Sequence, residues 1–187
     1  MLELAERAYN RRANQSVEEL AWLLDILSRR KLRRVLEIGC QDGGTFWAWS
    51  QIATADAQLL GIDWDPVGKL AETKTLPSRG RQKVKLIEAD SSDPATRDTV
   101  CDWLGSDYLD FLFIDGDHSA IGVRADWSAY STLVRPGGLV AFHDITSGPS
   151  NGVEAFWAEL KARYRTDEKI DPGHRNMERM GIGVLYL

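Results

Sequence analysis

The stretch from Arg34 to Trp49, RVLEIGCQDGGTFWAW, decides the fold of this chain. Its apolar start predicts a buried strand, Gly39 to Gly44 form a glycine-rich turn, and a helix is expected to open near Thr45. Strand, glycine turn and helix in this order build a nucleotide site in an open α/β sheet. The glycines let the backbone approach the ligand, which lies beyond the carboxyl ends of the strands.

The spacing of the glycines narrows the kind of nucleotide. A dinucleotide fingerprint reads G-x-G-x-x-G, whereas this turn reads E-x-G-x-x-x-G-G and begins at Glu37. Gln41 stands where the central glycine of the dinucleotide motif would be. The pattern therefore suits a ligand without a pyrophosphate and disfavours a nicotinamide-dependent dehydrogenase.

Length and composition indicate one ordinary globular domain. The chain has 187 residues, of which 43% are hydrophobic and 27% charged. A formal net charge of −5 argues against a nucleic-acid partner, and no apolar run is long enough to span a bilayer. The N-terminus lacks the apolar segment of a secretory signal, and two cysteines make no disulfide framework. These features predict a cytoplasmic protein whose partner is neither a nucleic acid nor a membrane.

Apolar patterns alternate between strand and helix along the whole chain. Beyond the first strand, strands are expected at 58–63, 83–89, 109–114, 139–142, 164–170 and 183–187. Helices are expected at 2–13, 16–27, 45–53, 96–104, 121–134 and 152–164. Pro136-Gly137-Gly138 is interpreted as a tight turn and 171–180 as a loop, whose His174 and Arg175 are possible substrate contacts. The alternation predicts a doubly wound α/β sheet.

Polar side chains follow the predicted strands. Asp63 ends the second strand, 24 residues after Gly39, where nucleotide-binding sheets place the acidic residue that binds ribose hydroxyls. Asp90 and Ser91 follow the third strand. The densest polar stretch, Asp115-Gly116-Asp117-His118-Ser119, follows the fourth strand, and His143-Asp144 follow the fifth. Within that stretch, Asp117 is expected to cap the next helix or to be exposed, and His118 could also serve as a cap.

These motifs resemble the class I S-adenosylmethionine-dependent methyltransferases. The glycine turn is similar to their motif I. F-I-D-G-D-H-S (113–119) and L-x-R-P-G-G-L-V-A-F-H-D-I (133–145) are similar to a family-24-like subgroup, which includes sugar and macrolide O-methyltransferases and cephalosporin hydroxylase-like proteins. The resemblance covers roughly Val35 to Ile145. It implies a Rossmann-like methyltransferase sheet of seven strands, mostly parallel, in the order 3-2-1-4-5-7-6 with strand 7 antiparallel.

The resemblance also implies an arrangement of the cofactor and of the domain. In the family, the glycine turn lies against the methionine part of S-adenosylmethionine, the residue after strand 2 binds the ribose, and residues after strand 3 read the adenine. The cofactor-binding residues expected on this basis are Glu37, Gly39, Gln41, Gly43, Asp63, Asp90, Ser91 and Asp115. The whole chain, 1–187, is expected to be one methyltransferase domain, in which 1–31 form a helical cap over the cofactor or substrate.

The two strand tips that carry Asp115 and Asp144 are neighbours in this sheet, so their carboxylates should face each other. They would repel unless a cation or a proton joined them. Metal-dependent O-methyltransferases hold Mg²⁺ at these two positions and add an Asn, but here that place is Ile145. His143 could replace the third ligand, and a histidine would shift selectivity toward Mn²⁺, Fe²⁺ or Zn²⁺. His143, His118 and Asp115 are therefore the candidate catalytic residues, with His143 preferred as base or ligand.

The resemblance implies O-methylation of a small hydroxylated metabolite, such as a sugar or a polyketide, assisted by a divalent cation. Two alternatives stay open. The first is a cofactor-binding protein without methyl transfer, acting as a regulatory or partner subunit. The second is an iron-dependent hydroxylase that uses His118, His143 and Asp144, provided that these three converge. A homo-oligomer is also considered, with candidate subunit contacts at Trp22, Trp47 and Trp49.

Overall fold

The computed structural model describes residues 1–64, 80–146, 148, 151–172 and 180–187. Within these residues, seven strands form one sheet in the order β3-β2-β1-β4-β5-β7-β6. Their bounds are β1 Arg34–Ile38, β2 Gln58–Asp63, β3 Lys83–Glu88, β4 Leu109–Ile114, β5 Val134–His143, β6 Arg165–Lys169 and β7 Ile182–Tyr186. β1 to β5 pair in parallel, while β7 runs antiparallel to both β5 and β6. The predicted fold class and strand order are confirmed.

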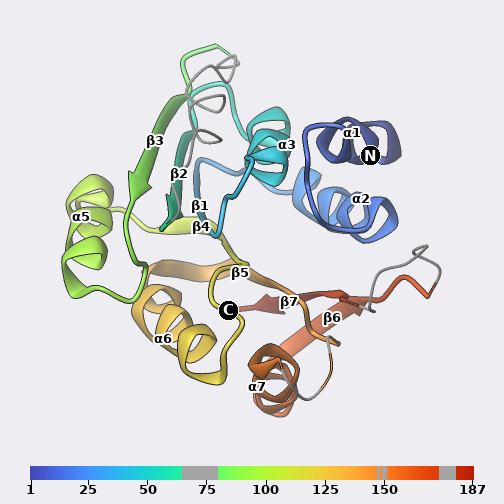
Figure 1. Ribbon diagram of the computed structural model, residues 1–187. Helices are drawn as coiled ribbons and strands as arrows, with labels where there is room; N and C mark the ends of the chain where they lie inside the picture. Colours follow the sequence, from blue (N-terminus) through green and yellow to red (C-terminus); the bar gives the residue numbers. More distant parts are fainter. Residues whose placement is uncertain (65–79, 147, 149–150, 173–179) are drawn as a thin grey trace.

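Helices cover both faces of the sheet (Figure 1). α1 (Leu2–Tyr9), α2 (Val17–Ser28) and α3 (Gly44–Ile52) lie on one face. α5 (Pro94–Leu104), α6 (Ala120–Tyr130) and α7 (Gly152–Lys161) lie on the other, and a short 3₁₀ turn, η1 (Ser131–Leu133), leads from α6 into β5. Among the described residues, none of the helices has the length and apolar character needed to cross a membrane.

Aromatic side chains fill the core on the α1–α3 face. Trp49 is fully buried and meets Phe111 and Phe113 of β4 edge to face, with ring centroids 5.3 and 5.4 Å apart. Trp47 is buried as well, and the guanidinium group of Arg11, just after α1, lies over its ring at 4.1 Å. Trp47 and Trp49 therefore pack inside the chain and are not exposed for the subunit contact that was considered for them.

The segment Pro136-Gly137-Gly138 belongs to β5 and is not the predicted turn. The Gly137 N–H donates to the Leu187 carbonyl oxygen at 2.6 Å, and the Leu187 N–H donates to Gly138 at 3.2 Å. The C-terminus therefore holds this segment in the sheet. The register with β4 shifts between Leu109 and Phe111, which accommodates the irregular backbone.

Candidate functional site

The turn after β1 can form only because two of its residues are glycines. Gly39 has a φ of +83°, and a Cβ atom there would come within 1.9 Å of the Asp115 carbonyl oxygen. The lack of a side chain thus lets the β1 turn lie directly against the tip of β4. Gly43, at φ +79°, is the N-cap of α3, so the helix starts one residue earlier than expected.

Glu37 and Asp63 hold this turn from two sides. Glu37 is fully buried behind it, its Oε1 accepts the hydroxyl hydrogen of Thr45, and burial raises the pKa of its carboxyl well above the usual value. Asp63 Oδ2 accepts the backbone N–H of Gln41 at 2.6 Å. The tip of β2 and the glycine turn are therefore joined, and the Gln41 backbone (φ +40°) is fixed.

A cavity of about 530 Å³ opens beside the tips of β1 to β4, a size typical of small-molecule sites. Its walls come from these strand tips and from the first turns of α6. Four of the predicted cofactor residues line it, namely Gly39, Asp63, Asp90 and Ser91. The other four, which the structure also describes, lie outside the lining: Glu37, Gln41, Gly43 and Asp115.

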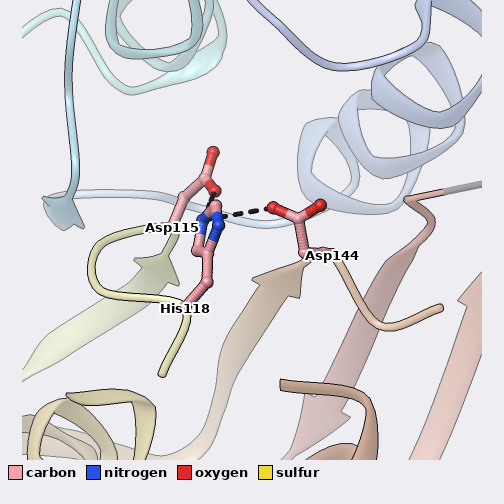
Figure 2. A group of neighbouring side chains, drawn as sticks. All are labelled: Asp115, His118 and Asp144. Atoms are coloured by element: carbon pink, nitrogen blue, oxygen red, sulfur yellow. Dashed lines mark hydrogen bonds and ion pairs between the residues drawn. The ribbon is translucent and has the colours of Figure 1, made fainter. Parts of the chain in front are cut away.

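Four side chains converge at the tips of β4 and β5, and we call them the His–Asp cluster (Asp115, His118, His143 and Asp144). The Nε2 atom of His118 lies 3.2 Å from Asp115 Oδ1 and 3.1 Å from Asp144 Oδ2. The Nδ1 atom of His143 lies at the same two distances from the same two oxygens. Figure 2 shows Asp115 and Asp144 turned toward the ring of His118. His118, which also lines the cavity, joins the two features.

The charges within the His–Asp cluster balance. Burial alone would lower the pKa of His143, but Asp115 and Asp144 outweigh it and raise the pKa to about 10. The hydrogen bond with Asp115 likewise raises the pKa of His118. Asp144 adopts the left-handed region at φ +63°, an uncommon conformation for a residue with a side chain and one that concentrates at functional sites.

The donor set of the cluster fits a divalent cation. Tetrahedral ligand atoms held at about 2.0–2.2 Å from one ion lie about 3.3–3.6 Å apart, and the four nitrogen–oxygen distances of the cluster, 3.1 and 3.2 Å, are only slightly shorter. Asp115, His118 and Asp144 offer ligand atoms that all lie within 4.8 Å of one another. A mixture of carboxylate oxygen and imidazole nitrogen favours a transition metal over Mg²⁺.

The segment between α1 and α2 reaches this edge of the sheet. Gln15 Nε2 donates to Asp115 Oδ2 at 2.6 Å, and Asn14 Nδ2 donates to Gln41 Oε1 at 2.5 Å. Ser16 caps α2 by accepting the Glu19 N–H, and the Glu19 carboxylate accepts the backbone N–H of Asp171. Gln15 was missed, because a glutamine in a polar turn has no spacing that indicates a site.

Of the alternatives for the stretch after β4, the structure excludes the caps. The N-cap of α6 is Ser119, whose Oγ accepts the Gly122 N–H at 3.0 Å, so neither Asp117 nor His118 caps this helix, and Asp117 is exposed, as its other alternative predicts. Asp117 instead accepts hydrogen bonds from the backbone and hydroxyl of Ser119. His118, His143 and Asp144 do converge, which meets the condition attached to the hydroxylase alternative. His174 and Arg175 lie outside the described residues.

Comparisons with known proteins agree with this geometry. The chain resembles the O-methyltransferase from Bacillus cereus in complex with SAH (TM-score 0.71, 14% identity, covering 99% of this chain and 90% of that one). It also resembles the O-methyltransferase TomG from Streptomyces achromogenes, which is involved in tomaymycin synthesis and was solved with SAM (TM-score 0.65, 19% identity, covering 100% of this chain and 88% of that one). A third similar structure is the SAH-bound methyltransferase PaMTH1 from Podospora anserina (TM-score 0.62, 19% identity, covering 97% of this chain and 86% of that one). At these identities the likeness shows the fold.

The family itself is shown by the sequence. No curated protein matches the chain. A family model described as a methyltransferase domain, however, matches residues 36–145, more than half of the 187 residues. The matched segment runs from β1 through the glycine turn to the His–Asp cluster. The chain therefore belongs to this methyltransferase family and is an S-adenosylmethionine-dependent methyltransferase.

Proposed function

We propose that this protein methylates a hydroxyl group of a small metabolite, such as a sugar or polyketide-like compound, and that a divalent cation on the His–Asp cluster assists. The observation that carries the proposal is the position of His118, which belongs both to the cluster and to the wall of the cavity. A substrate bound at the cluster would therefore lie next to a cofactor in the cavity. Structural neighbours named as O-methyltransferases support this acceptor chemistry.

The cavity supports an assignment of the cofactor residues. Asp63, at the tip of β2, would bind the ribose hydroxyls, and Asp90 with Ser91 would lie near the adenine. The methionine part would extend toward the glycine turn, where Gly39 permits close approach and Gln41 is held by Asp63. Glu37 and Gly43 would not contact the cofactor and would instead fix the conformation of the glycine turn. Neighbours solved with SAM or SAH support the identity of the cofactor.

At the cluster, Asp115 and Asp144 would provide oxygen ligands and His143 a nitrogen ligand. His143 is only 3% exposed, which suits a ligand better than a base that must reach the substrate. A divalent cation bound there would lower the pKa of the substrate hydroxyl and fix its orientation. The side chain of His118 is 45% exposed, and once the cation had taken Asp115 and Asp144 from it, its neutral imidazole would accept the hydroxyl proton and release it to solvent. Bound S-adenosylmethionine would supply the methyl group, and the cluster and the cavity would align the substrate oxygen with it for in-line transfer.

The first experiment is a calorimetric titration with S-adenosylhomocysteine on the wild type, on Asp63→Ala, and on Asp98→Ala as a control on the exposed side of α5. Loss of the Asp63 carboxylate is expected to weaken binding at least about tenfold, because both the ribose contact and the anchor of Gln41 are removed. The control should bind like the wild type. If the wild type bound no S-adenosylhomocysteine with or without Mn²⁺, the proposal would be wrong.

A second titration, with Mn²⁺, tests the cluster. Asp144→Asn is expected to weaken Mn²⁺ binding at least about tenfold, because it replaces a charged ligand while an Asn still tolerates a positive φ. Asp117→Asn is the matched control, since Asp117 lies in the same stretch and its carboxylate accepts hydrogen bonds from Ser119. Equal Mn²⁺ affinity in the two variants would refute the metal site.

The convergence of His118, His143 and Asp144 also favours a second candidate, an iron-dependent hydroxylase. The two activities leave different products. Methyl transfer forms S-adenosylhomocysteine with any competent cation, whereas hydroxylation consumes dioxygen and requires Fe²⁺. The protein is incubated with hydroxylated acceptors, and S-adenosylhomocysteine formation and dioxygen consumption are then measured. The result decides between methyl transfer and hydroxylation. Binding of the cofactor with neither product would instead favour a regulatory or partner subunit without methyl transfer.

A further inference from the structure

Asp126 is a buried carboxylate in the wall of the cofactor cavity. It lies on α6, is 1% exposed, and lines the cavity. Neither of its oxygens has a hydrogen-bond partner of good geometry among the described residues. A Cβ atom on Gly116 would come within 3.1 Å of Asp126 Oδ2, so the carboxylate lies against the backbone at the tip of β4.

An arrangement of this kind is costly for the ligand-free protein. A buried carboxyl loses its hydration, and a hydrogen bond with Ser91 offsets this loss only in part. Burial raises the pKa of Asp126 to about 6, the nearby charges of Asp117 and Asp90 act in the same direction, and Ser91 opposes them only in part. A carboxyl that merely held α6 in place would have a partner of good geometry in the fold. Asp126 has a cavity in front of it instead.

We propose that Asp126 recognises the 6-amino group of the adenine and so selects an adenosyl cofactor. The inference rests on the proposed function and deepens it. Asp63 would place the ribose near β2, so the base would extend toward the β3 loop and α6, where Asp126 lies. The Watson–Crick edge of adenine offers an N–H donor beside an acceptor nitrogen. A carboxyl group accepts from that amine and, when protonated, also donates to the ring nitrogen.

The predicted adenine-reading residue Asp90 is less suited to this contact. Its Oδ1 already accepts hydrogen bonds from both the backbone and the hydroxyl of Ser92, each at 2.8 Å. Asp90 therefore closes the turn that leads into α5, while Asp126 keeps both oxygens for a ligand. Asp126 was missed in the sequence because it follows no strand and lies in the middle of a helix.

The test compares S-adenosylhomocysteine with its analogue that lacks the 6-amino group, by calorimetry, on the wild type, Asp126→Ala and Asp126→Asn. The wild type should prefer S-adenosylhomocysteine about tenfold or more, because the analogue leaves the carboxyl unpaired. Asp126→Ala should bind the two ligands with nearly equal affinity, and Asp126→Asn should retain part of the preference. Asp98→Asn, on the exposed side of α5, is the control and should behave like the wild type.

A thermal unfolding measurement without ligand separates recognition from a structural role. Asp126→Asn should melt at or above the wild-type temperature while its preference for the amine falls. A lower melting temperature with an unchanged preference would overturn the inference. So would equal discrimination by the wild type and Asp126→Ala, a result that leaves the proposed function intact. Failure of the wild type to bind S-adenosylhomocysteine would overturn both.

Discussion

Asp126 shows how a single buried group can set the pH dependence of stability. Its pKa is about 6 in the fold and 3.8 in its unperturbed state. A pKa raised by folding contributes stability that is fully present below pH 3.8 and is lost as the pH rises through about 6. The ionised carboxyl therefore costs the ligand-free protein on the order of 3 kcal/mol near pH 7.

We therefore expect Asp126→Asn to stabilise the ligand-free protein in a pH-dependent way. The difference in melting temperature between variant and wild type should grow between about pH 4 and pH 6.5 and then level off. Thermal unfolding, followed by circular dichroism across this pH range, measures this difference. Subtracting the wild-type melting temperature from that of the variant removes the contribution of all other titrating groups. A difference that stayed constant with pH would show that Asp126 keeps an ordinary pKa in the folded protein.

At the level of single residues, the sequence predicted those site residues that end a strand. Asp63, Asp115 and Asp144 follow apolar runs, and parallel strands bring such ends to one edge. Gln15 and Asp126 follow no strand, and only the packing of α2 and α6 brings them to that edge. Local pattern carries no information about such contacts.

Among the elements, the turn between β1 and α3 is the most constrained. Gly39→Ala is expected to destabilise the protein by more than about 3 kcal/mol, because the new methyl group would overlap the Asp115 carbonyl at a φ of +83°. Gly105→Ala provides the control, since that residue also has a positive φ (+61°) but a Cβ added there would meet no atom within 4 Å. Its cost should be about 1–3 kcal/mol, from the backbone conformation alone (φ +61°, ψ −121°). Urea unfolding of the two variants would give the comparison, and similar losses would contradict the close approach of β1 and β4.

The boundaries of helices and strands were predicted well where the pattern of apolar residues sets them. They were predicted poorly where a contact with a distant part of the chain sets them. β2 has the predicted bounds, because its apolar run is continuous. β5 begins five residues earlier than expected, at Val134, because the C-terminus pairs with Gly137 and Gly138. Pro-Gly-Gly is typical of a turn, and nothing local indicates that the last residue of the chain will bind it.

Across the whole molecule, the order of the strands came from the resemblance to a family, since alternation alone predicts only a doubly wound sheet. The packing also connects the helical segment 1–31 to the rest of the fold. Ala5 and Ala8 of α1 are fully buried and belong to the same core as Trp49 and Phe111. Asn14 and Gln15 add hydrogen bonds to the glycine turn and to the tip of β4. We propose that 1–187 form one cooperative domain.

The last prediction follows from this shared core. Ala8→Asp should lower the melting temperature of the entire protein, because it places a charge in the α1 interface, which belongs to the main core. Glu6→Ala, on the exposed side of the same helix, should change it little. Tryptophan fluorescence and far-UV circular dichroism should report a single coincident transition in the wild type and both variants, as two-state unfolding requires. An early fluorescence transition that left S-adenosylhomocysteine binding intact would instead mean that α1 and α2 unfold as a separate unit, and that the cap covers the site without supporting it.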